Sequence, residues 1–439
     1  MSTEKTPLRI AIAGLGTVGT GVIRLIDSNS DLLAERAGRA IEIVAVSARE
    51  RHRERGVAID RFAWEDDMTA MARRDDVDVV VELVGGSDGP ALTLARDTLS
   101  AGKGLVTANK AMIAHHGLEL SRLAESKGAP LAFEAAVAGG IPILKGLREG
   151  AVANRLTRLY GVLNGTANFI LSSMEEKGAD FAVALEEAQR LGYAEADPGF
   201  DIDGTDAAHK LSILAALAFG SELDYASVAT HGIDRVRAAD IVQADALGYV
   251  IRLVAMADMD GSRGDGASLM QEVRPCLVPR GHPLSHVTGA TNAVVAEGNF
   301  VGRLLFQGAG AGDGPTASAV VADLVDIARG TAGHAFSITA DALSPSPAAD
   351  RGARTGRNYI RFAVKDRTGV LAEITAAMRD SGVSIESLIQ KGRSDNGGEV
   401  LVAMVTHDGE WRCVEQAVEI LNRSEDHTAE PLVMPILGA

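Results

Sequence analysis

Residues 8–24 read LRIAIAGLGTVGTGVIR, and this stretch decides the fold at the start of the chain. Its first six residues form a short apolar run that predicts a buried strand. Gly14, Gly16 and Gly19 follow at GxGxxG spacing and lead into a helical pattern. In that context the glycines permit close approach of the backbone to a pyrophosphate at a helix N-terminus. The stretch therefore predicts a dinucleotide site; the alternative is a glycine-rich turn that binds nothing.

Further apolar strands, 41–48 and 76–86, alternate with amphipathic helices as far as about residue 140. This alternation indicates a doubly wound parallel sheet. The later run 271–306 favours antiparallel strands, and the last eighty residues follow a β-α-β-β-α-β order, which is ferredoxin-like. We therefore expect an α/β protein with the following parts: a Rossmann-type domain over 1–140 completed by 308–335, a central α+β catalytic and dimerisation domain over 141–307, a linker over 344–357, and a regulatory domain over 358–439.

Composition excludes several classes of protein. The chain has 439 residues, with 43 Lys and Arg against 59 Asp and Glu. The resulting net charge of −16 disfavours a surface that binds nucleic acid. It has no uncharged apolar stretch of about 18 residues, so we expect no membrane span. Only Cys276 and Cys413 occur, without metal-site spacing, and the N-terminus lacks the pattern of a signal peptide. We expect a cytoplasmic protein.

Basic residues follow two of the predicted strands. Ser47, Ala48 and Arg49 stand at the end of the second strand, where an NAD enzyme usually offers an acid to the ribose. An arginine there would pair with a 2′-phosphate, which favours NADP over NAD. Lys110 ends a later strand and points to the carboxyl edge of the sheet, where ligands bind; the alternative is a solvated lysine in a loop.

The stretch DIDGTDAAHKLSILAALAF (201–219) combines charge with an apolar helix. Asp206 and Lys210 share one helical face by their i, i+4 spacing. The residues after Lys210 are nearly all apolar, so we expect the lysine to be partly desolvated and to act as a proton donor. The alternative is a surface ion pair. From the pattern alone, Asp201 and Asp203 suit the positive end of the helix dipole.

Histidines and cysteines make a weaker case for catalysis. His209 is adjacent to Lys210, but neighbouring helix positions face apart, so we expect it to pack elsewhere. The pairs His115–His116 and His282/His286 lack a third metal ligand, and we interpret them as structural. Neither cysteine lies in an active-site-like turn, which disfavours chemistry through a thiohemiacetal.

Six motifs spread over the chain resemble the homoserine dehydrogenase family. They are GLGTVG, VTANKAMIA, FEAAVAGGIPIL, LYGVLNGTANFIL, LGYAEADPGFDIDGTDAAHKLSIL and GAGAGDGPTASAVVADL. The resemblance implies reversible reduction of L-aspartate 4-semialdehyde to L-homoserine with NAD(P)H. In the last motif Asp313 and Gly314 stand where the family usually has an apolar residue, which leaves the details of cofactor closure open.

The resemblance also implies roles for residues at matching positions. Lys210 becomes the proton donor, with Lys110 a second lysine near the nicotinamide. Glu195 and Asp206 would hold the amino-acid end of the substrate, and we include Asp201 with them. The candidate cofactor-binding residues are Gly14, Gly16, Thr17, Val18, Gly19, Arg49, Lys110, Gly192 and Gly308. The family's monovalent-cation site, usually sodium, corresponds to Glu134 with the backbone of Val137, Gly139 and Ile141; the alternative is an ordinary strand-to-helix turn.

The C-terminal part resembles an ACT domain, a module that binds amino acids. Asp366, Thr368, Gly369 and Val370 fill its first strand-to-helix loop. The implied effector is threonine, and the alternative is a dimerisation module without a ligand. We expect a homodimer or homotetramer.

Two other functions compete with this interpretation. Another ACT-containing dehydrogenase, such as a 3-phosphoglycerate dehydrogenase, acts on an anion and should present arginines, whereas these candidate residues are acids suited to an ammonium group. A non-catalytic sensor of dinucleotide and amino acid has no need of a desolvated lysine beside its cofactor.

Overall fold

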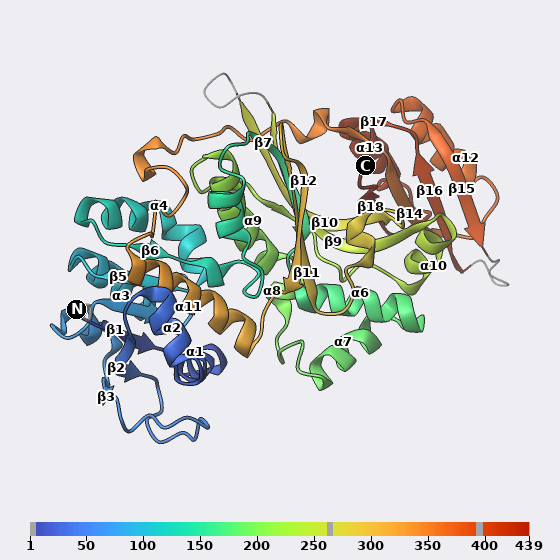
Figure 1. Ribbon diagram of the computed structural model, residues 1–439. Helices are drawn as coiled ribbons and strands as arrows, with labels where there is room; N and C mark the ends of the chain where they lie inside the picture. Colours follow the sequence, from blue (N-terminus) through green and yellow to red (C-terminus); the bar gives the residue numbers. More distant parts are fainter. Residues whose placement is uncertain (1–5, 261–266, 392–397, 439) are drawn as a thin grey trace.

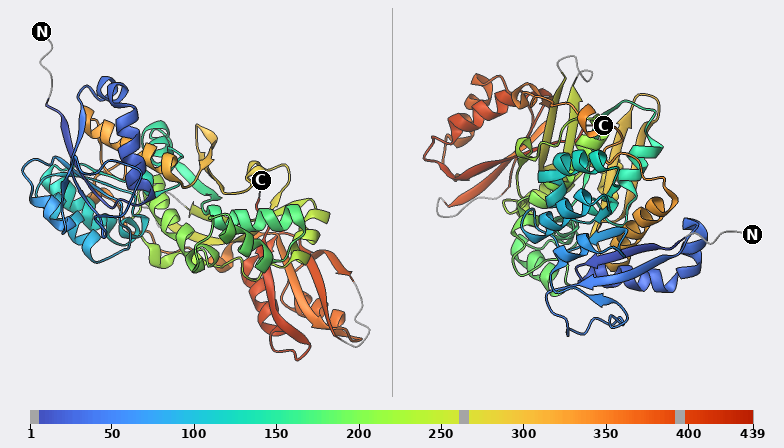
Figure 2. Two further views of the ribbon diagram at one scale, coloured as in Figure 1. Left: turned by 90° about the horizontal axis from the view of Figure 1, so that it is seen from below. Right: turned by 90° about the vertical axis from the view of Figure 1, so that its left-hand side faces the viewer.

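Three parts of the protein lie in a row in the computed structural model, which describes residues 6–260, 267–391 and 398–438 (Figure 1). The N-terminal part is at one end, the C-terminal part at the other, and a second sheet lies between them (Figure 2). Within the described residues, no helix has the length and apolar character needed to cross a membrane.

The N-terminal part is built on a six-stranded parallel sheet of order β3-β2-β1-β4-β5-β6. Its strands are β1 (Leu8–Ala13), β2 (Ile41–Ser47), β3 (Ala63–Trp64), β4 (Val79–Glu82), β5 (Gly104–Thr107) and β6 (Leu131–Ala132). The predicted Rossmann topology is confirmed, and the order reverses between β1 and β4 at the edge where such folds bind ligands. The helices of this part are α1 (Thr17–Ser28), α2 (Ser30–Ala37), α3 (Pro90–Ser100) and α4 (Lys110–Lys127).

Helix α11 (Asp313–Arg329) returns from late in the chain and packs against α1. Its apolar face joins the cluster that β1 and α1 form, including Val22, Val320 and Leu324. Asp313, one of the two residues that depart from the family pattern, pairs with Arg24 of α1. The departure therefore adds a polar contact between the two helices.

The central part is a six-stranded sheet of order β12-β11-β7-β9-β10-β8. All its pairs are antiparallel except β8 with β10, which confirms the antiparallel strands predicted over 271–306. Its strands are β7 (Leu156–Val162), β8 (Ala229–Thr230), β9 (Tyr249–Asp260), β10 (Ser268–Pro279), β11 (Thr291–Gly298) and β12 (Gly302–Ala309). Its helices are α5 (Ile143–Lys145), α6 (Gly165–Lys177), α7 (Phe181–Arg190), α8 (Gly199–Ile202), α9 (Thr205–Phe219) and α10 (Ala238–Ala246). Helix α9 lies against β7, β9 and β10 and is buried over most of its length, as its composition predicts.

The C-terminal part has the predicted ferredoxin-like order, with a sheet β15-β16-β14-β18. Its elements are β14 (Asn358–Lys365), α12 (Val370–Asp380), β15 (Ile385–Lys391), β16 (Glu399–Thr406), α13 (Trp411–Leu421) and β18 (His427–Pro435). A short pair, β13 (Thr355–Gly356) with β17 (Gly409–Glu410), lies beside it. A buried ion pair docks this part on α10: Arg361 Nε lies 2.9 Å from Asp240 Oδ1, and Tyr359 donates to the same oxygen.

The segment 344–357 follows the surface of the central sheet. The Leu269 amide donates to the Pro347 carbonyl, and the Ala349 amide donates back to Leu269. Arg351 donates to the Ser227 carbonyl at 2.7 Å. The segment is thus docked by backbone hydrogen bonds, and the domain boundaries drawn from the sequence stay a prediction.

Candidate active site

The carboxylate of Asp206 is the centre of a charged cluster between the N-terminal and central parts. Lys210 Nζ donates to Asp206 Oδ2 at 2.6 Å, and Lys110 Nζ lies 3.1 Å from Oδ1. One carboxylate thus holds both predicted lysines. The two lysines are a hundred residues apart in sequence, so the fold itself brings them together.

Lys210 is buried on the inner face of α9, with 11% of its side chain exposed. Besides the bond to Asp206, it donates to the Leu163 carbonyl at 2.8 Å, and Asn292 donates to the same carbonyl. An ammonium has three protons. Within the described residues two are used by protein acceptors, which leaves the third for a ligand.

Lys110 begins α4, directly after β5, and its side chain is 38% exposed. Asn109 caps this helix by accepting from the Met112 amide, and it donates to the Gly86 carbonyl. Lys110 is therefore at the carboxyl edge of the parallel sheet, as the sequence predicts, and on the more open side of the cluster.

Glu82, which the sequence analysis missed, orders the two loops at this edge. It is fully buried at the end of β4 and accepts from the Val84 and Gly85 amides. Its other oxygen accepts from Thr107 Oγ1 at 2.6 Å, just ahead of Lys110. The sequence does carry a signal for Glu82: it is an acidic residue at the end of an apolar strand that leads into Gly85–Gly86.

Asn164, also missed, connects the acids of the cluster. Its side-chain nitrogen donates to Asp201 Oδ1 at 2.7 Å and to Asp206 Oδ2 at 2.8 Å. Its oxygen accepts from the Ala167 amide and caps α6. The cap position was readable from the sequence, but the two long-range bonds were not.

Charges in the cluster shift the pKa values of its members. Burial by itself would raise the pKa of Asp206, but Lys210 and Lys110 outweigh it and hold that pKa below its ordinary value. Asp206 in turn raises the pKa of Lys110 against the effect of burial. The pKa of Asp201 is raised, first by burial and also by the charge of Asp206, despite the bond from Asn164. The arrangement keeps Asp206 ionised and favours an added cation beside Asp201.

The loop 191–200 contributes exposed residues to the same region. The Glu195 side chain is exposed and does not join the hydrogen-bonded cluster of described residues, although its charge acts on Lys110. Gly192 has φ +79° at an open turn, where an added Cβ would meet nothing within 4 Å. Phe200 is 73% exposed on α8.

The glycine turn has the shape that a dinucleotide needs. Gly14 has φ +102°, and an added Cβ there would lie 2.6 Å from the Leu83 carbonyl oxygen; at Gly19 it would lie 2.0 Å from the Gly14 carbonyl oxygen. At Gly16, the N-cap of α1, it would meet nothing within 4 Å. Thr17 and Val18 form the first turn of α1, so the helix N-terminus and the open face at Gly16 fit a pyrophosphate.

Two other predicted cofactor residues lie on different elements. Arg49 is exposed just beyond β2. Arg55, from the same basic loop, donates to the Leu15 carbonyl in the glycine turn at 3.3 Å. Gly308 is on β12, where an added Cβ would lie 3.2 Å from Ile141.

Buried acidic side chains outnumber buried basic side chains around Glu134. Both oxygens of Glu134 accept backbone amides of α5, from Leu144 and Lys145, at 2.9 Å. Its own amide donates to the buried carboxylate of Asp323. Lys145 is shared between Asp323 and Asp326. Burial and then the charge of Asp323 raise the pKa of Glu134 to about 7, so a monovalent cation fits the charge balance.

Some backbone carbonyl groups near Glu134 already accept hydrogen bonds from the backbone. The Val137 amide donates to the Glu134 carbonyl, and the Ile141 amide donates to Ala138, which has φ +51°. Gly139 packs against Thr316 of α11. These contacts show a tight turn and do not by themselves assign a cation to it.

His209 packs away from the cluster, as predicted. Its ring stacks on Tyr225 with centroids 4.4 Å apart and meets His115 edge-on. Burial and then the charge of His115 lower its pKa to about 4. His209 is thus a neutral ring that packs behind Lys210.

Comparison with known families accounts for most of the chain. Residues 14–134 match the family model "Homoserine dehydrogenase, NAD binding domain", residues 142–325 match "Homoserine dehydrogenase", and residues 358–410 match "ACT domain".

Individual relatives give the same result. The homoserine dehydrogenase of Pseudomonas aeruginosa is 43% identical over 422 residues, 94% of each chain. The crystal structure of a homoserine dehydrogenase from Thiobacillus denitrificans superposes with a TM-score of 0.91 at 39% identity over 99% of both chains. A hyperthermophilic archaeal homoserine dehydrogenase in complex with NADPH has a TM-score of 0.61 at 27% identity, covering 73% of this chain and 97% of its own.

Replacing Glu82 tests whether it positions the loop that carries Lys110. Glu82→Gln exchanges one acceptor oxygen for an NH2 group, which cannot accept from the Val84 and Gly85 amides and can meet Thr107 only if that hydroxyl accepts instead of donating. We expect kcat to fall by about ten- to a hundredfold, because small displacements of a catalytic group are that costly. Steady-state kinetics measures this. Thr107→Val removes the donor to Glu82 and the acceptor of the Asn109 amide but leaves the bonds from Val84 and Gly85 to Glu82, so we expect it to show a smaller loss. An unchanged kcat in Glu82→Gln would exclude the positioning role.

Proposed function

Since the chain belongs to the homoserine dehydrogenase family and is an NAD(P)-dependent oxidoreductase that acts on a CH–OH group, we propose which of its residues carry out the reaction. The reaction is the reversible reduction of L-aspartate 4-semialdehyde to L-homoserine. The bridging of Lys110 and Lys210 by Asp206 is the observation that carries the proposal.

Acids at the site recognise the ammonium group of the substrate. Glu195 is exposed, and Asp201, which interacts with Asn164 and Thr166, keeps acceptor positions for a further donor. Asp206 already accepts from Lys110, Lys210 and Asn164, so it offers a single remaining acceptor position. Glu195 and Asp201 therefore take the larger share of the ammonium, and Asp206 positions the lysines.

Lys210 supplies the proton to the carbonyl oxygen. When bound, the nicotinamide cofactor supplies the hydride that reduces the carbonyl carbon. The oxygen then becomes an alkoxide and needs a donor within hydrogen-bond reach. The third proton of the Lys210 ammonium meets that need, and Lys110 adds a second positive charge on the open side.

NADP is the proposed cofactor, with NAD as the alternative. Arg49 and Arg55 follow β2, where a 2′-phosphate would lie, and Arg55 contacts the glycine turn. The archaeal relative in complex with NADPH supports this choice. The pyrophosphate would rest on the backbone from Gly14 to Gly19.

The remaining assignments are broader. We propose sodium at Glu134, because burial and Asp323 leave uncompensated negative charge there. We propose threonine as an inhibitor bound at the loop from Asp366 to Val370, where Gly369 is the N-cap of α12 and has φ +103°. The edge strand β12 exposes Leu305, which supports a homodimer or homotetramer. We place the enzyme in the cytoplasm, in the pathway from aspartate to threonine, methionine and isoleucine.

Replacing Lys210 tests the proton donor. Lys210→Met keeps the length of the side chain and removes its protons, so kcat should fall about a hundredfold or more, since a general acid contributes that much. NADPH binding, followed by fluorescence, should stay within about twofold, because the hydrogen bonds of Lys210 go to Asp206 and Leu163 and not to the glycine turn. Assays with NADPH and NADH also compare the two cofactors.

Two further variants make this result specific. Lys177→Met, at the exposed end of α6, should leave kcat unchanged. Full turnover in Lys210→Met would remove Lys210 from the mechanism, and a larger loss in Lys110→Met would assign proton transfer to Lys110.

Stability in different salts tests the cation. The pKa of Glu134 is raised to about 7 in the folded protein. Between about pH 4.5 and pH 7, Glu134 therefore binds more protons in the folded protein than in the unfolded chain. The free energy of unfolding falls as pH rises through this window. At about pH 8, a bound cation would offset the carboxylate charge. We expect a higher Tm in sodium chloride than in equal choline chloride, and no such difference in Glu134→Gln. Glu186→Gln, an exposed change on α7, should retain it. Equal Tm values in both salts for the unaltered protein would rule the site out.

A further inference from the structure

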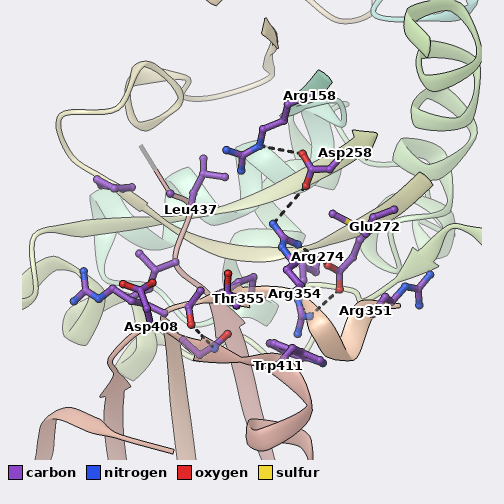
Figure 3. A pocket seen from close by; sticks show the side chains of 18 of the residues that line it. Arg158, Asp258, Glu272, Arg274, Arg351, Arg354, Thr355, Asp408, Trp411 and Leu437 are labelled. Atoms are coloured by element: carbon purple, nitrogen blue, oxygen red, sulfur yellow. Dashed lines mark hydrogen bonds and ion pairs between the residues drawn. The ribbon is translucent and has the colours of Figure 1, made fainter. Parts of the chain in front are cut away.

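A cavity of about 630 Å³ lies where the central sheet, the segment 351–357 and the ACT part meet (Figure 3). One wall comes from β7, β9 and β10 with the chain after β18, which bonds to Leu277 of β10, and the other comes from Trp411 of α13 and the segment 354–357. The described residues that line it include no member of the active-site cluster and none of the loop Asp366–Val370. That loop is at the opposite end of β14, roughly 25 Å away by the rise of a strand. The cavity is thus separate from both sites.

Side chains of alternating charge form a continuous chain of ion pairs across the cavity (Figure 3). In order of contact they are Arg158, Asp258, Arg354, Glu272 and Arg274. The successive nitrogen-to-oxygen distances are 3.2, 3.9, 3.3 and 2.7 Å. Arg354 belongs to the segment before the ACT part, so its two ion pairs link that segment to β9 and β10.

The lining carries an excess of positive charge. Among the residues that the structure describes, five arginines and three acids contribute to it: Arg158, Arg274, Arg351, Arg354, Arg357, Asp258, Glu272 and Asp408. The chain as a whole has a net charge of −16, so this cavity is of opposite sign to the protein. Such a concave surface attracts small anions.

Two of the arginines have capacity for a ligand. Arg354 is 30% exposed; one terminal nitrogen donates to Glu272 at 3.3 Å, and the other lies 3.9 Å from Asp258 and donates to Met256 Sδ, a weak acceptor that a ligand oxygen can replace. The Nε atom of Arg158 pairs with Asp258. Among the described residues no acceptor binds its two terminal nitrogens, so they can bind a ligand. A planar guanidinium binds carboxylate or phosphate oxygens in pairs.

We propose that this cavity binds a small organic anion that presents carboxylate or phosphate oxygens to Arg158 and Arg354. Trp411, at the wall formed by the ACT part, offers an apolar surface for the remainder of the ligand, and Leu437 lines the opposite side, where its amide donates to the Leu277 carbonyl of β10 (Figure 3). Arg274 lies over the Trp411 ring at 4.3 Å, which holds that ring in place.

Strand β10 connects the cavity to the active site. Successive residues of a strand face opposite sides of the sheet. Glu272 and Arg274 line the cavity, whereas Val273 between them packs on Gly204, with 3.1 Å to the position of an added Cβ. Gly204 is the N-cap of α9, the helix that carries Asp206 and Lys210. A ligand that draws Arg354 from Glu272 therefore changes the support of α9, and we expect it to change KM for the semialdehyde.

The test uses the enzyme saturated with NADPH, so that anions cannot compete for its phosphate site. Succinate and inorganic phosphate are titrated separately, with Tm and KM as readouts. At least one should raise Tm and shift KM about twofold or more, and the responding probe identifies the ligand as a carboxylate or a phosphate. In Arg354→Gln the apparent Kd should rise about tenfold or more, because a charged hydrogen bond is lost. Arg354→Lys should recover part of the affinity.

Matched variants separate this site from others. Arg412→Gln, which changes an arginine of α13 outside the lining, should bind the probe normally. Thr368→Ala should abolish the response to L-threonine but keep the response to the probe. Arg354→Gln should abolish the response to the probe but keep the response to L-threonine, so the two sites are tested independently. No response to either probe, or equal weakening in Arg354→Gln and Arg412→Gln, would overturn the proposal. Binding without a change in KM would overturn the coupling through β10.

Discussion

The carboxylate of Asp206 is the interaction on which the active site depends. Two ammonium groups, from helices that begin in different parts of the molecule, meet on its two oxygens. Moving a charged group from water into the protein interior is costly unless an opposite charge is beside it. Lys210 and Asp206 are therefore stable in the core only as a pair. The pair explains why a helix as apolar as α9 carries charge on its first turns. It also fixes where a substrate oxygen has to lie.

The rest of the fold serves to bring these groups to one place. The parallel sheet ends at the edge that holds Lys110, and Glu82 and Asn109 order the loops there. The antiparallel sheet supports α9, and the end of β7 supplies the carbonyl that accepts from Lys210. Helix α11 returns to pack on α1 and so joins the two parts. The site is therefore formed between two sheets, each of which fixes one lysine.

Local patterns in the sequence were sufficient for the architecture. The apolar run before Gly14 and the glycine spacing predicted β1, its turn and α1, and the apolar residues after Lys210 predicted the burial of α9. Glu82 and Asn164 were missed because their side-chain partners are 25 to 42 residues away in sequence and follow no helical or strand period. The composition of 344–357 indicated a linker but not its docking on β10, since backbone hydrogen bonds leave no trace in residue type.

Titration of Lys110 tests the central claim most directly. Competitive acetylation across a range of pH, read by mass spectrometry, gives the pKa of this amine in the intact protein. Because Asp206 is the first cause of its raised pKa, the account predicts a value above that of an ordinary lysine, and a clear fall when Asp206 is replaced by Asn. The same pKa in both proteins would contradict the account, because the carboxylate would then not be holding the second lysine.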